Sequence, residues 1–187
     1  MVTVDDNRTR RVGPARSVLL LLLALTTALA AGVVFLVLRS HGDALDHPAH
    51  PLNDEQTRAQ VVEPAKQIVA VANLQDAIGG YILMSCKNQT DPPYQGAIYL
   101  TFNLPTSLDY FDQIGAAMVA RGWQKGLPPN QYLFGTTVYK DGVTAILYRD
   151  PDHRTSGIMK LYGECRDVVN HRNDTTGWTD ITDQLHT

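Results

Sequence analysis

The sequence lacks the short motifs on which most catalytic and metal sites are built. It contains no Gly-x-Ser-x-Gly elbow, no His-Glu-x-x-His pair, no EF-hand spacing and no glycine loop between a strand and a helix. Its two cysteines are too few and too far apart for a zinc site. Nucleophilic and phosphoryl-transfer chemistry therefore lack support, and we expect a protein that is not an enzyme and needs no cofactor.

Basic residues are scarce beyond the N-terminal 39 residues. Residues 1–39 hold five arginines against two aspartates, a net charge of +3, whereas residues 40–187 hold 11 Lys and Arg against 17 Asp and Glu, a net charge of −6. Sequence-independent binding to nucleic acid requires a concentrated basic face that displaces counterions from phosphates. The acidic remainder of the chain offers no such face, so we expect no nucleic-acid partner.

Charge is absent from the whole of segment 17–38, which includes five consecutive leucines. A helix of this length spans roughly 33 Å, enough to cross the hydrocarbon core of a membrane. Four arginines precede the segment, and the bias of basic residues towards the cytoplasm places residues 1–16 inside and residues 40–187 outside. We therefore predict a cytoplasmic tail, a single transmembrane helix that binds the lipid bilayer, and an extracytoplasmic domain at the cell membrane.

A cleaved secretory signal is the alternative interpretation of segment 17–38. Ala28, Leu29 and Ala30 form a small-x-small cleavage site after an apolar stretch. We favour an uncleaved anchor because the apolar stretch is longer than that of a usual signal. A lipoprotein signal would need a cysteine at the cleavage site, and the first cysteine of the chain is Cys86.

The two cysteines, Cys86 and Cys165, are expected to form a disulfide. Thiols outside the reducing cytoplasm tend to oxidise, and this is the one intramolecular pairing that the sequence allows. The bond would close a loop of about 80 residues and stabilise the domain by roughly 4.5 kcal/mol before native strain is subtracted.

Segment 39–52 contains prolines and a glycine but no sustained apolar period, which predicts a linker. It carries three histidines and two aspartates: His41, His47, His50, Asp43 and Asp46. Imidazole and carboxylate groups so close in sequence are compatible with metal binding or pH sensing. We favour a solvated spacer, because a flexible linker does not hold ligands in place.

Hydrophobic patterns predict an α+β domain over residues 53–169, followed by a C-terminal tail, 170–187, that is loosely packed or forms one short helix. The expected elements are a helix from Asn53 to about 72, strands at 78–86 and 97–102, a helix at 107–121, and strands at 132–140, 143–149 and 158–165. Two hairpin-rich groups joined through a helix indicate an antiparallel sheet of about five strands with the helices packed on one face.

Local signals set several of these boundaries. Asn53 is a helix N-cap, and Pro64 predicts either a kink in this helix or the start of a second one. Thr106 or Ser107 is expected to cap the second helix. The strongest hairpin signal is the pair Asp141-Gly142, because a tight turn needs positive φ at its centre.

Three sets of side chains are candidate functional residues: Asp150, Asp152 and His153 in one loop; Asp109 and Asp112 on the second helix; and Tyr81, Tyr99, Tyr139, Tyr148 and Tyr162 on the predicted strands. The loop set resembles a metal ligand group but is more typical of a turn whose carboxylates bond their own backbone. The helix set suits the helix dipole. The tyrosines are typical of a half-buried sheet, although they could line a binding groove. Trp123 is expected to pack on the core instead of stacking on a ligand.

The chain resembles small exported envelope domains of actinobacteria, including mycobacterial membrane proteins and lipoproteins. The features that carry the resemblance are the apolar anchor, the helix ending Ala120-Arg121-Gly122-Trp123, the proline-bearing loop after it, the aromatic hairpin 132–148 and the closing Gly163-Glu164-Cys165. The chain departs from the lipoprotein members because it has no cysteine to lipidate. The resemblance implies a cell-envelope location and carries no catalytic residue over to this sequence.

Two functional hypotheses follow from the sequence. The first is a membrane-anchored, non-enzymatic domain that binds a protein partner or serves as an accessory subunit of a membrane complex. The alternative is a binder of a small molecule, lipid or glycan on the open face of the sheet. A flat exposed apolar patch would favour the first, and a deep apolar pocket opposite the helices would favour the second.

Overall fold

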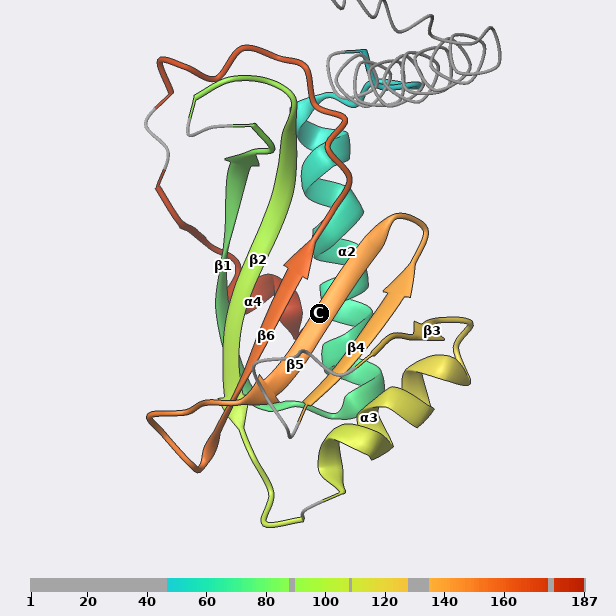
Figure 1. The fold of residues 1–187 in the computed structure, drawn as a ribbon. Helices are drawn as coiled ribbons and strands as arrows, with labels where there is room; N and C mark the ends of the chain where they lie inside the picture. The colour runs from blue at the N-terminus through green and yellow to red at the C-terminus, as the bar shows by residue number, and fades with distance from the viewer. Residues whose placement is uncertain (1–46, 88–89, 108, 128–134, 175–176, 187) are drawn as a thin grey trace, which may run out of the picture. The chain divides into compact units, whose positions relative to one another are not determined.

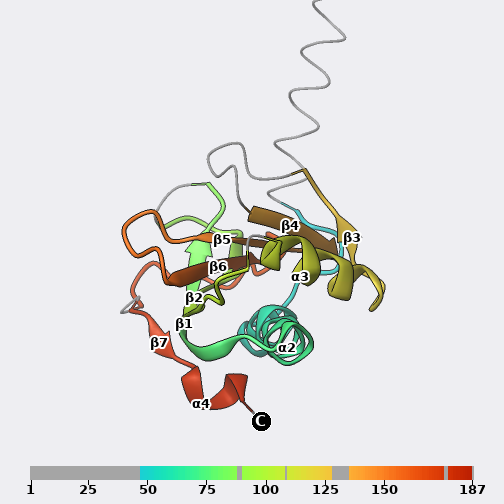
Figure 2. The same ribbon diagram turned by 90° about the horizontal axis from the view of Figure 1, so that it is seen from below.

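The fold is a seven-stranded antiparallel sheet with strand order β3-β4-β5-β6-β2-β1-β7, and its helices lie on one side (Figures 1 and 2). The computed structural model describes residues 47–186 apart from 88–89, 108, 128–134 and 175–176. The α+β class, the antiparallel sheet and the one-sided helices are confirmed. The sheet has seven strands instead of about five, because two-residue strands at its edges carry no hydrophobic pattern of their own.

The described elements occur in the following order along the chain: α2 (Asp54–Ala72), β1 (Gln75–Ser85), β2 (Tyr94–Asn103), α3 (Tyr110–Val119), β3 (Gln124–Lys125), β4 (Gly135–Lys140), β5 (Val143–Arg149), β6 (Ser156–Tyr162), β7 (Thr179–Asp180) and α4 (Thr182–Leu185). The predicted cytoplasmic tail 1–16, the predicted transmembrane helix 17–38 and most of the predicted linker 39–52 lie outside the described residues. Among the helices of the described residues, none combines the length and apolar character needed to cross a membrane.

Helix α2 begins at the predicted cap and runs without interruption through Pro64. The Asn53 side chain accepts a hydrogen bond from the backbone N–H of Gln56, and the Gln56 side chain accepts one from the backbone N–H of Asn53. This reciprocal pair satisfies two N–H groups that the first turn would leave without partners. The helix ends at Asn73, whose left-handed backbone (φ 50°) turns the chain into β1.

Helix α3 is shorter than the sequence predicts. Its N-cap is Asp109, so the expectation of a cap at Thr106 or Ser107 is wrong. The chain leaves the helix through Gly122 (φ +85°), as a glycine stop signal predicts. Trp123 is buried, as expected, and its indole N–H donates to Gln67 Oε1 on α2 at 3.0 Å.

The β4–β5 hairpin confirms the Asp-Gly signal. Both Asp141 (φ 50°) and Gly142 (φ 78°) have positive φ, and residue Lys140 pairs with Val143 directly across the turn. Positive φ at both central positions matches the twist of the flanking strands, so the turn fixes the strand register.

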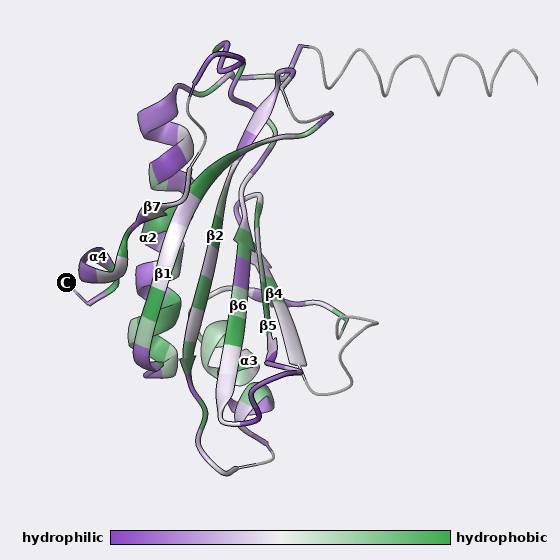
Figure 3. Cartoon of the chain, turned by 90° about the vertical axis from the view of Figure 1, so that its left-hand side faces the viewer, coloured by the Kyte–Doolittle hydropathy of each residue, from purple (hydrophilic) through white to green (hydrophobic). Residues whose placement is uncertain are grey.

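One face of the sheet forms the core with α2 and α3 (Figure 2). Alternate residues of β2, namely Ile98, Leu100 and Phe102, point to this helix-covered face and are buried. Figure 3 shows hydrophobic segments along the strands and on the second half of α2, whereas its first turns are hydrophilic. The alternation therefore assigns Tyr99 and Thr101 to the opposite face of the sheet.

The C-terminal segment is part of the domain, which corrects the expectation of a loosely packed tail. Residues Thr179 and Asp180 pair with the middle of β1, and Ile181 and Leu185 are buried in the core. The short helix that was the other possibility for this segment is α4.

Glycine is required at Gly79 in β1, because a Cβ there would lie 2.5 Å from the Cβ of Leu100 on the neighbouring strand β2.

Cys86 and Cys165 form a disulfide, the pairing expected from the sequence. Cys86 follows β1 and Cys165 follows β6, and β2 lies between these two strands in the sheet. The disulfide therefore joins the ends of the two strands that flank β2.

Replacing both cysteines by serine in a fragment of residues 45–187 should lower the free energy of unfolding by roughly 2–5 kcal/mol, because the unfolded chain regains the freedom of a long loop. Urea denaturation of the variant and of the oxidised parent measures this difference. An unchanged midpoint, or two free thiols by mass in the purified full chain, would contradict the disulfide.

Candidate functional site

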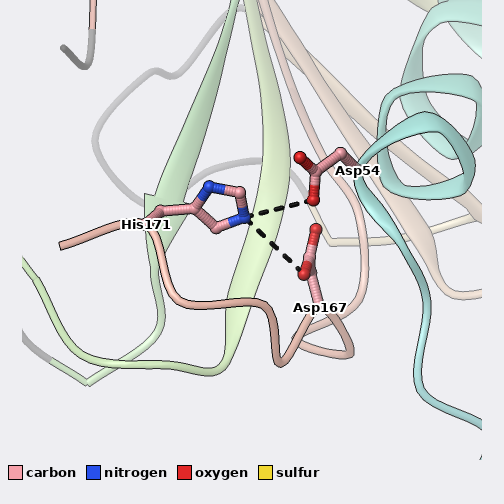
Figure 4. Close-up of side chains that lie close together, drawn as sticks. All are labelled: Asp54, Asp167 and His171. Atoms are coloured by element: carbon pink, nitrogen blue, oxygen red, sulfur yellow. Dashed lines mark ion pairs between the residues drawn. The ribbon is translucent and has the colours of Figure 1, made fainter. Parts of the chain in front are cut away.

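Three ionisable side chains from distant parts of the chain meet beside the first turn of α2 (Figure 4). Asp54 is the first residue of α2, whereas Asp167 and His171 belong to the segment that follows β6. His171 Nε2 lies 3.2 Å from Asp54 Oδ1 and 3.8 Å from Asp167 Oδ1. One donor atom from each residue lies within 4.8 Å of the other two, a spacing that could hold a metal ion.

Asp167 is held in place from three directions. Its side chain is fully buried, and its Oδ2 accepts a hydrogen bond from Thr57 Oγ1 of α2 at 3.1 Å. Its Oδ1 accepts the backbone N–H of Val169 at 3.0 Å. The backbone of Asp167 also exchanges two hydrogen bonds with Tyr94 at the start of β2. These bonds offset the cost of removing a carboxylate from water and fix its direction.

His171 is buried to a similar degree, with 5% of its side chain exposed. Its Nδ1 lies 2.5 Å from Asp174 Oδ2, and its ring packs edge-on against Tyr94 with 5.0 Å between ring centroids. The other ring nitrogen, Nε2, has no hydrogen-bond partner among the described residues, although it faces Asp54 and Asp167 (Figure 4). The ring is therefore anchored through one nitrogen, and the other points into the space between two carboxylates.

The carboxylates make this part of the domain electronegative. Burial lowers the pKa of His171, but the hydrogen bond to Asp174 and the charges of Asp54 and Asp167 outweigh it, so the pKa lies above its ordinary value. Burial and, to a smaller extent, the charge of Asp167 raise the pKa of Tyr81 to about 12, although the charge of Arg58 opposes the shift. Tyr81 is therefore neutral at physiological pH.

A second candidate site is a hollow of about 440 Å³ on the sheet face opposite α2 and α3, here named the Trp178 hollow. Gly80 and Tyr99 form its floor, and a Cβ at Gly80 would lie only 3.2 Å from the Trp178 ring, so glycine lets the indole lie close to the strand. Two large apolar side chains on its rim, Ile78 and Trp178, are 57% and 56% exposed. Its lining comprises Ile78, Gly79, Gly80, Tyr99, Thr101, Trp178, Asp180 and Thr182.

The five candidate tyrosines do not assemble into one groove. Tyr81 lies on the helix-covered face, where the Arg58 guanidinium sits 5.2 Å from its ring centroid. Strand register and alternation place the other four on the opposite face: Tyr99, Tyr139, Tyr148 and Tyr162. Of these four, Tyr99 lines the Trp178 hollow.

The loop with Asp150, Asp152 and His153 is a turn, as its composition favours. Asp150 Oδ1 accepts the backbone N–H groups of Asp152 and His153, and the first of these bonds is the main cause of its lowered pKa. On α3, Asp109 precedes the first turn, and Asp112 pairs with Lys125 at 2.8 Å.

The linker histidines contribute no cluster within the described residues. His47 and His50 are exposed, and neither joins the group formed by Asp54, Asp167 and His171. His41, Asp43 and Asp46 lie outside the described residues. The backbone carbonyl of His50 accepts a hydrogen bond from Arg166 Nε at 2.8 Å, so the end of this segment is attached to the domain.

Sequence reasoning missed the group at Asp54, Asp167 and His171. Asp54 was not singled out, because a carboxylate is expected at a helix N-terminus, where the helix dipole favours it. The spacing Asp-x-x-x-His at 167–171 was the available signal, but it spans the boundary between the predicted domain and its predicted tail. In the structure, the segment that follows β6 and carries Cys165 brings Asp167 and His171 next to Asp54.

These observations define the class of protein as a disulfide-linked α+β domain built on one antiparallel sheet. The chain belongs to the LppJ family, because the family model described as "Putative lipoprotein LppJ" matches residues 53–184. Proteins of that name from Mycobacterium tuberculosis (strain CDC 1551 / Oshkosh) and Mycobacterium bovis are each 45% identical over 170 residues, covering 88% of this chain and 90% of the relative. No solved structure matches the chain.

The comparisons confirm the resemblance to mycobacterial envelope proteins at the level of the family. The match extends to residue 184, within α4, and so includes β7. The relatives are named as lipoproteins, whereas the first cysteine of this chain is Cys86, which is bonded to Cys165. Residues 1–52 of the sequence contain no cysteine.

The stability of the chelator-treated domain should depend on the charge of His171. A histidine whose folded pKa exceeds its unfolded value of about 6.5 stabilises the fold fully below that value, and this contribution is lost as pH rises through the folded pKa. The free energy of unfolding of residues 45–187 in EDTA should therefore fall over this range. His171→Gln should flatten the dependence, whereas His153→Gln should not; equal slopes in the parent and in His171→Gln would contradict the assignment.

Proposed function

We propose that this chain is a membrane-anchored, extracytoplasmic domain of the cell envelope that binds a protein partner through the Trp178 hollow and acts as an accessory subunit of a membrane complex. The observation that carries the proposal is the exposure of two large apolar side chains, Ile78 and Trp178, on one hollow. Exposed apolar side chains that lie together on a folded domain mark a binding surface, whereas apolar residues exposed singly are ordinary.

The anchoring part of the proposal rests on the sequence and the family. The family description supports attachment to a membrane outside the cytoplasm. Cys86 and Cys165 are bonded to each other, which supports an anchor other than a lipid on either cysteine. The uncharged segment 17–38 supplies it instead, with the arginines before it on the cytoplasmic side.

The binding part of the proposal rests on the character of the hollow. Trp178 contacts Tyr99 edge-on, with 6.3 Å between ring centroids, so the indole has a supporting ring beneath it. The ionisable residue of its lining is Asp180, whose carboxylate accepts the backbone N–H of Thr182. An open hollow with two exposed apolar side chains, and one carboxylate that is already hydrogen-bonded, supports a protein partner more than a reaction.

A small molecule, lipid or glycan is the second candidate occupant of the hollow. The observation in its favour is that Trp178 and Tyr99 form an aromatic surface above a glycine floor, with Lys160 Nζ 6.0 Å from the Tyr99 ring centroid. Aromatic faces next to a cation can accommodate a flat or chain-like ligand.

Replacing Ile78 by Ser and Trp178 by Ala in the full chain should abolish the stoichiometric co-purification of a membrane or envelope protein in mild detergent. The two changes remove the apolar rim, while both positions are exposed and the fold should keep its melting temperature. Quantitative mass spectrometry of the purified complexes measures the ratio of partner to bait.

Val119→Ser is the matched control, because Val119 is also an exposed apolar residue, 46% exposed, but lies on α3. It should retain the partner. Retention of the partner by the Ile78 and Trp178 variant would refute binding through the hollow. A parent that purifies alone but carries an extractable lipid or glycan, lost in the same variant, would establish the second candidate.

The anchor has a separate test. The full chain should remain in the membrane after alkaline carbonate extraction, with an intact mass that shows neither lipid nor loss of segment 17–38, and protease added to spheroplasts should digest residues 40–187. Deleting segment 17–38 should release the protein. A mature N-terminus after Ala30, or full protection from protease, would contradict this topology.

A further inference from the structure

We propose that Asp54, Asp167 and His171 bind one divalent transition-metal cation of the Zn²⁺ class. This inference is independent of the Trp178 hollow. It begins from His171 Nε2, a buried nitrogen without a hydrogen-bond partner among the described residues. Buried polar atoms are rarely left unpaired, so such an atom requires a physical explanation.

The direction of His171 Nε2 supplies the first argument. It points towards Asp54 and Asp167 (Figure 4), at 3.2 Å from the nearer carboxylate oxygen, a distance at which an aligned N–H would form a hydrogen bond. His171 Nε2 nevertheless forms no hydrogen bond with a described residue. The nitrogen instead faces the space between two carboxylates, where a neutral imidazole would direct its lone pair towards a shared cation.

The separations of the donor atoms supply the second argument. Zn²⁺ binds histidine nitrogen and carboxylate oxygen at about 2.0–2.2 Å, so neighbouring ligand atoms in a tetrahedral site are roughly 3.4 Å apart. The separations from His171 Nε2 to Asp54 Oδ1 and to Asp167 Oδ1, 3.2 and 3.8 Å, lie on either side of this value. Since all three ligand atoms lie within 4.8 Å of one another, a cation could be accommodated if the side chains move closer together.

The surroundings of the three side chains supply the third argument. A histidine that binds a metal through one nitrogen usually donates the N–H of the other to a carboxylate, which fixes the tautomer. Asp174 Oδ2 occupies this position, 2.5 Å from His171 Nδ1. Asp167 is likewise fixed, by Thr57 Oγ1 and by the backbone N–H of Val169.

The balance of charge also favours a cation. Within the described part of the chain, the ion pairs of Asp54, Asp167 and Asp174 all go to His171. Three carboxylates therefore face one imidazole, and the group carries excess negative charge even when that ring is protonated. The nearby Arg58 points elsewhere, donating to Gln184 and lying against the Tyr81 ring.

The donor set selects the class of cation. One imidazole nitrogen and two carboxylate oxygens suit Zn²⁺ or Mn²⁺, whereas Ca²⁺ and Mg²⁺ prefer oxygen ligands alone and more of them. Asp54 is 63% exposed, so a cation can enter from solvent on that side. Three protein ligands leave a further coordination position for water or for a group from a bound molecule.

The test uses the full chain, purified in mild detergent without a histidine tag and stripped with EDTA. Isothermal titration with ZnCl₂, repeated with MnCl₂, CaCl₂ and MgCl₂, measures stoichiometry and affinity. We expect one Zn²⁺ per chain, weaker Mn²⁺ binding and no saturable binding of Ca²⁺ or Mg²⁺. Visible absorption of the Co²⁺ form gives an independent readout of nitrogen and oxygen coordination.

Three variants assign the ligands. Asp54→Asn and His171→Gln should each weaken Zn²⁺ binding at least tenfold, and Asp174→Asn should weaken it about 10–100-fold through loss of the outer carboxylate. Asp54 is exposed and its substitution is nearly isosteric, so this variant keeps the test valid if His171→Gln does not fold. The matched control is His153→Gln, which removes the other His–Asp pair, an exposed one at 3.2 Å, and should leave the affinity unchanged.

Either of two results would overturn the proposal. The first is a parent chain that takes up no Zn²⁺ or Mn²⁺ at a single saturable site. The second is a Zn²⁺ affinity that does not change in Asp54→Asn. An equal loss of Zn²⁺ affinity in His153→Gln and in Asp54→Asn would count in the same way. Tighter binding of Ca²⁺ than of Zn²⁺ would overturn the assigned class of cation.

Discussion

The buried carboxylate of Asp167 is the constraint on which the arrangement of the domain depends. A charged group removed from water must be compensated by hydrogen bonds or opposite charge, otherwise the fold cannot tolerate it. Here the compensation comes from Thr57 on α2, from the backbone of Val169 and from the His171 ring. Because the Asp167 backbone also pairs with β2 and with Leu52, one residue connects the entry to α2, the sheet and the C-terminal segment. The disulfide at Cys165 holds the same segment covalently, two residues away.

The fold was predictable from the sequence where local chemistry decides the structure. Asn53 and Gln56 form a capping pair whatever surrounds them, and Asp141-Gly142 forms a tight turn for reasons internal to the hairpin. The parts that were missed depend on contacts far along the chain. The two-residue strands β3 and β7 exist because a neighbouring edge is available, and Ile181 and Leu185 become core residues only when the segment folds back across α2 and β1.

The candidate metal site was unpredictable for the same reason. Asp54 and Asp167 are more than 110 residues apart in the sequence. The presence of Asp54 is explained by the helix N-terminus, where the dipole favours a carboxylate, and Asp167 stands at the start of a polar stretch where an aspartate is ordinary. Their relation to His171 is created by the course of the chain after β6. The tyrosines show what the sequence pattern can and cannot predict. Alternation identified tyrosines that lie on strands, but only the strand register shows that Tyr81 and Tyr99 lie on opposite faces of the sheet.

The short strand β7 also affects how the domain behaves towards copies of itself. Strand β1 is eleven residues long and lies next to the edge of the sheet, where unpaired backbone groups can recruit a strand from another chain. Only Gly80 and Tyr81 are paired with β7, but Ile181 and Thr182 also hydrogen-bond to Gly79, so the C-terminal segment lies across the middle of this edge. The segment 179–182 therefore covers part of this edge, and a chain cut before Thr179 would leave the backbone groups of a long, partly apolar strand open to pairing with another copy of the chain.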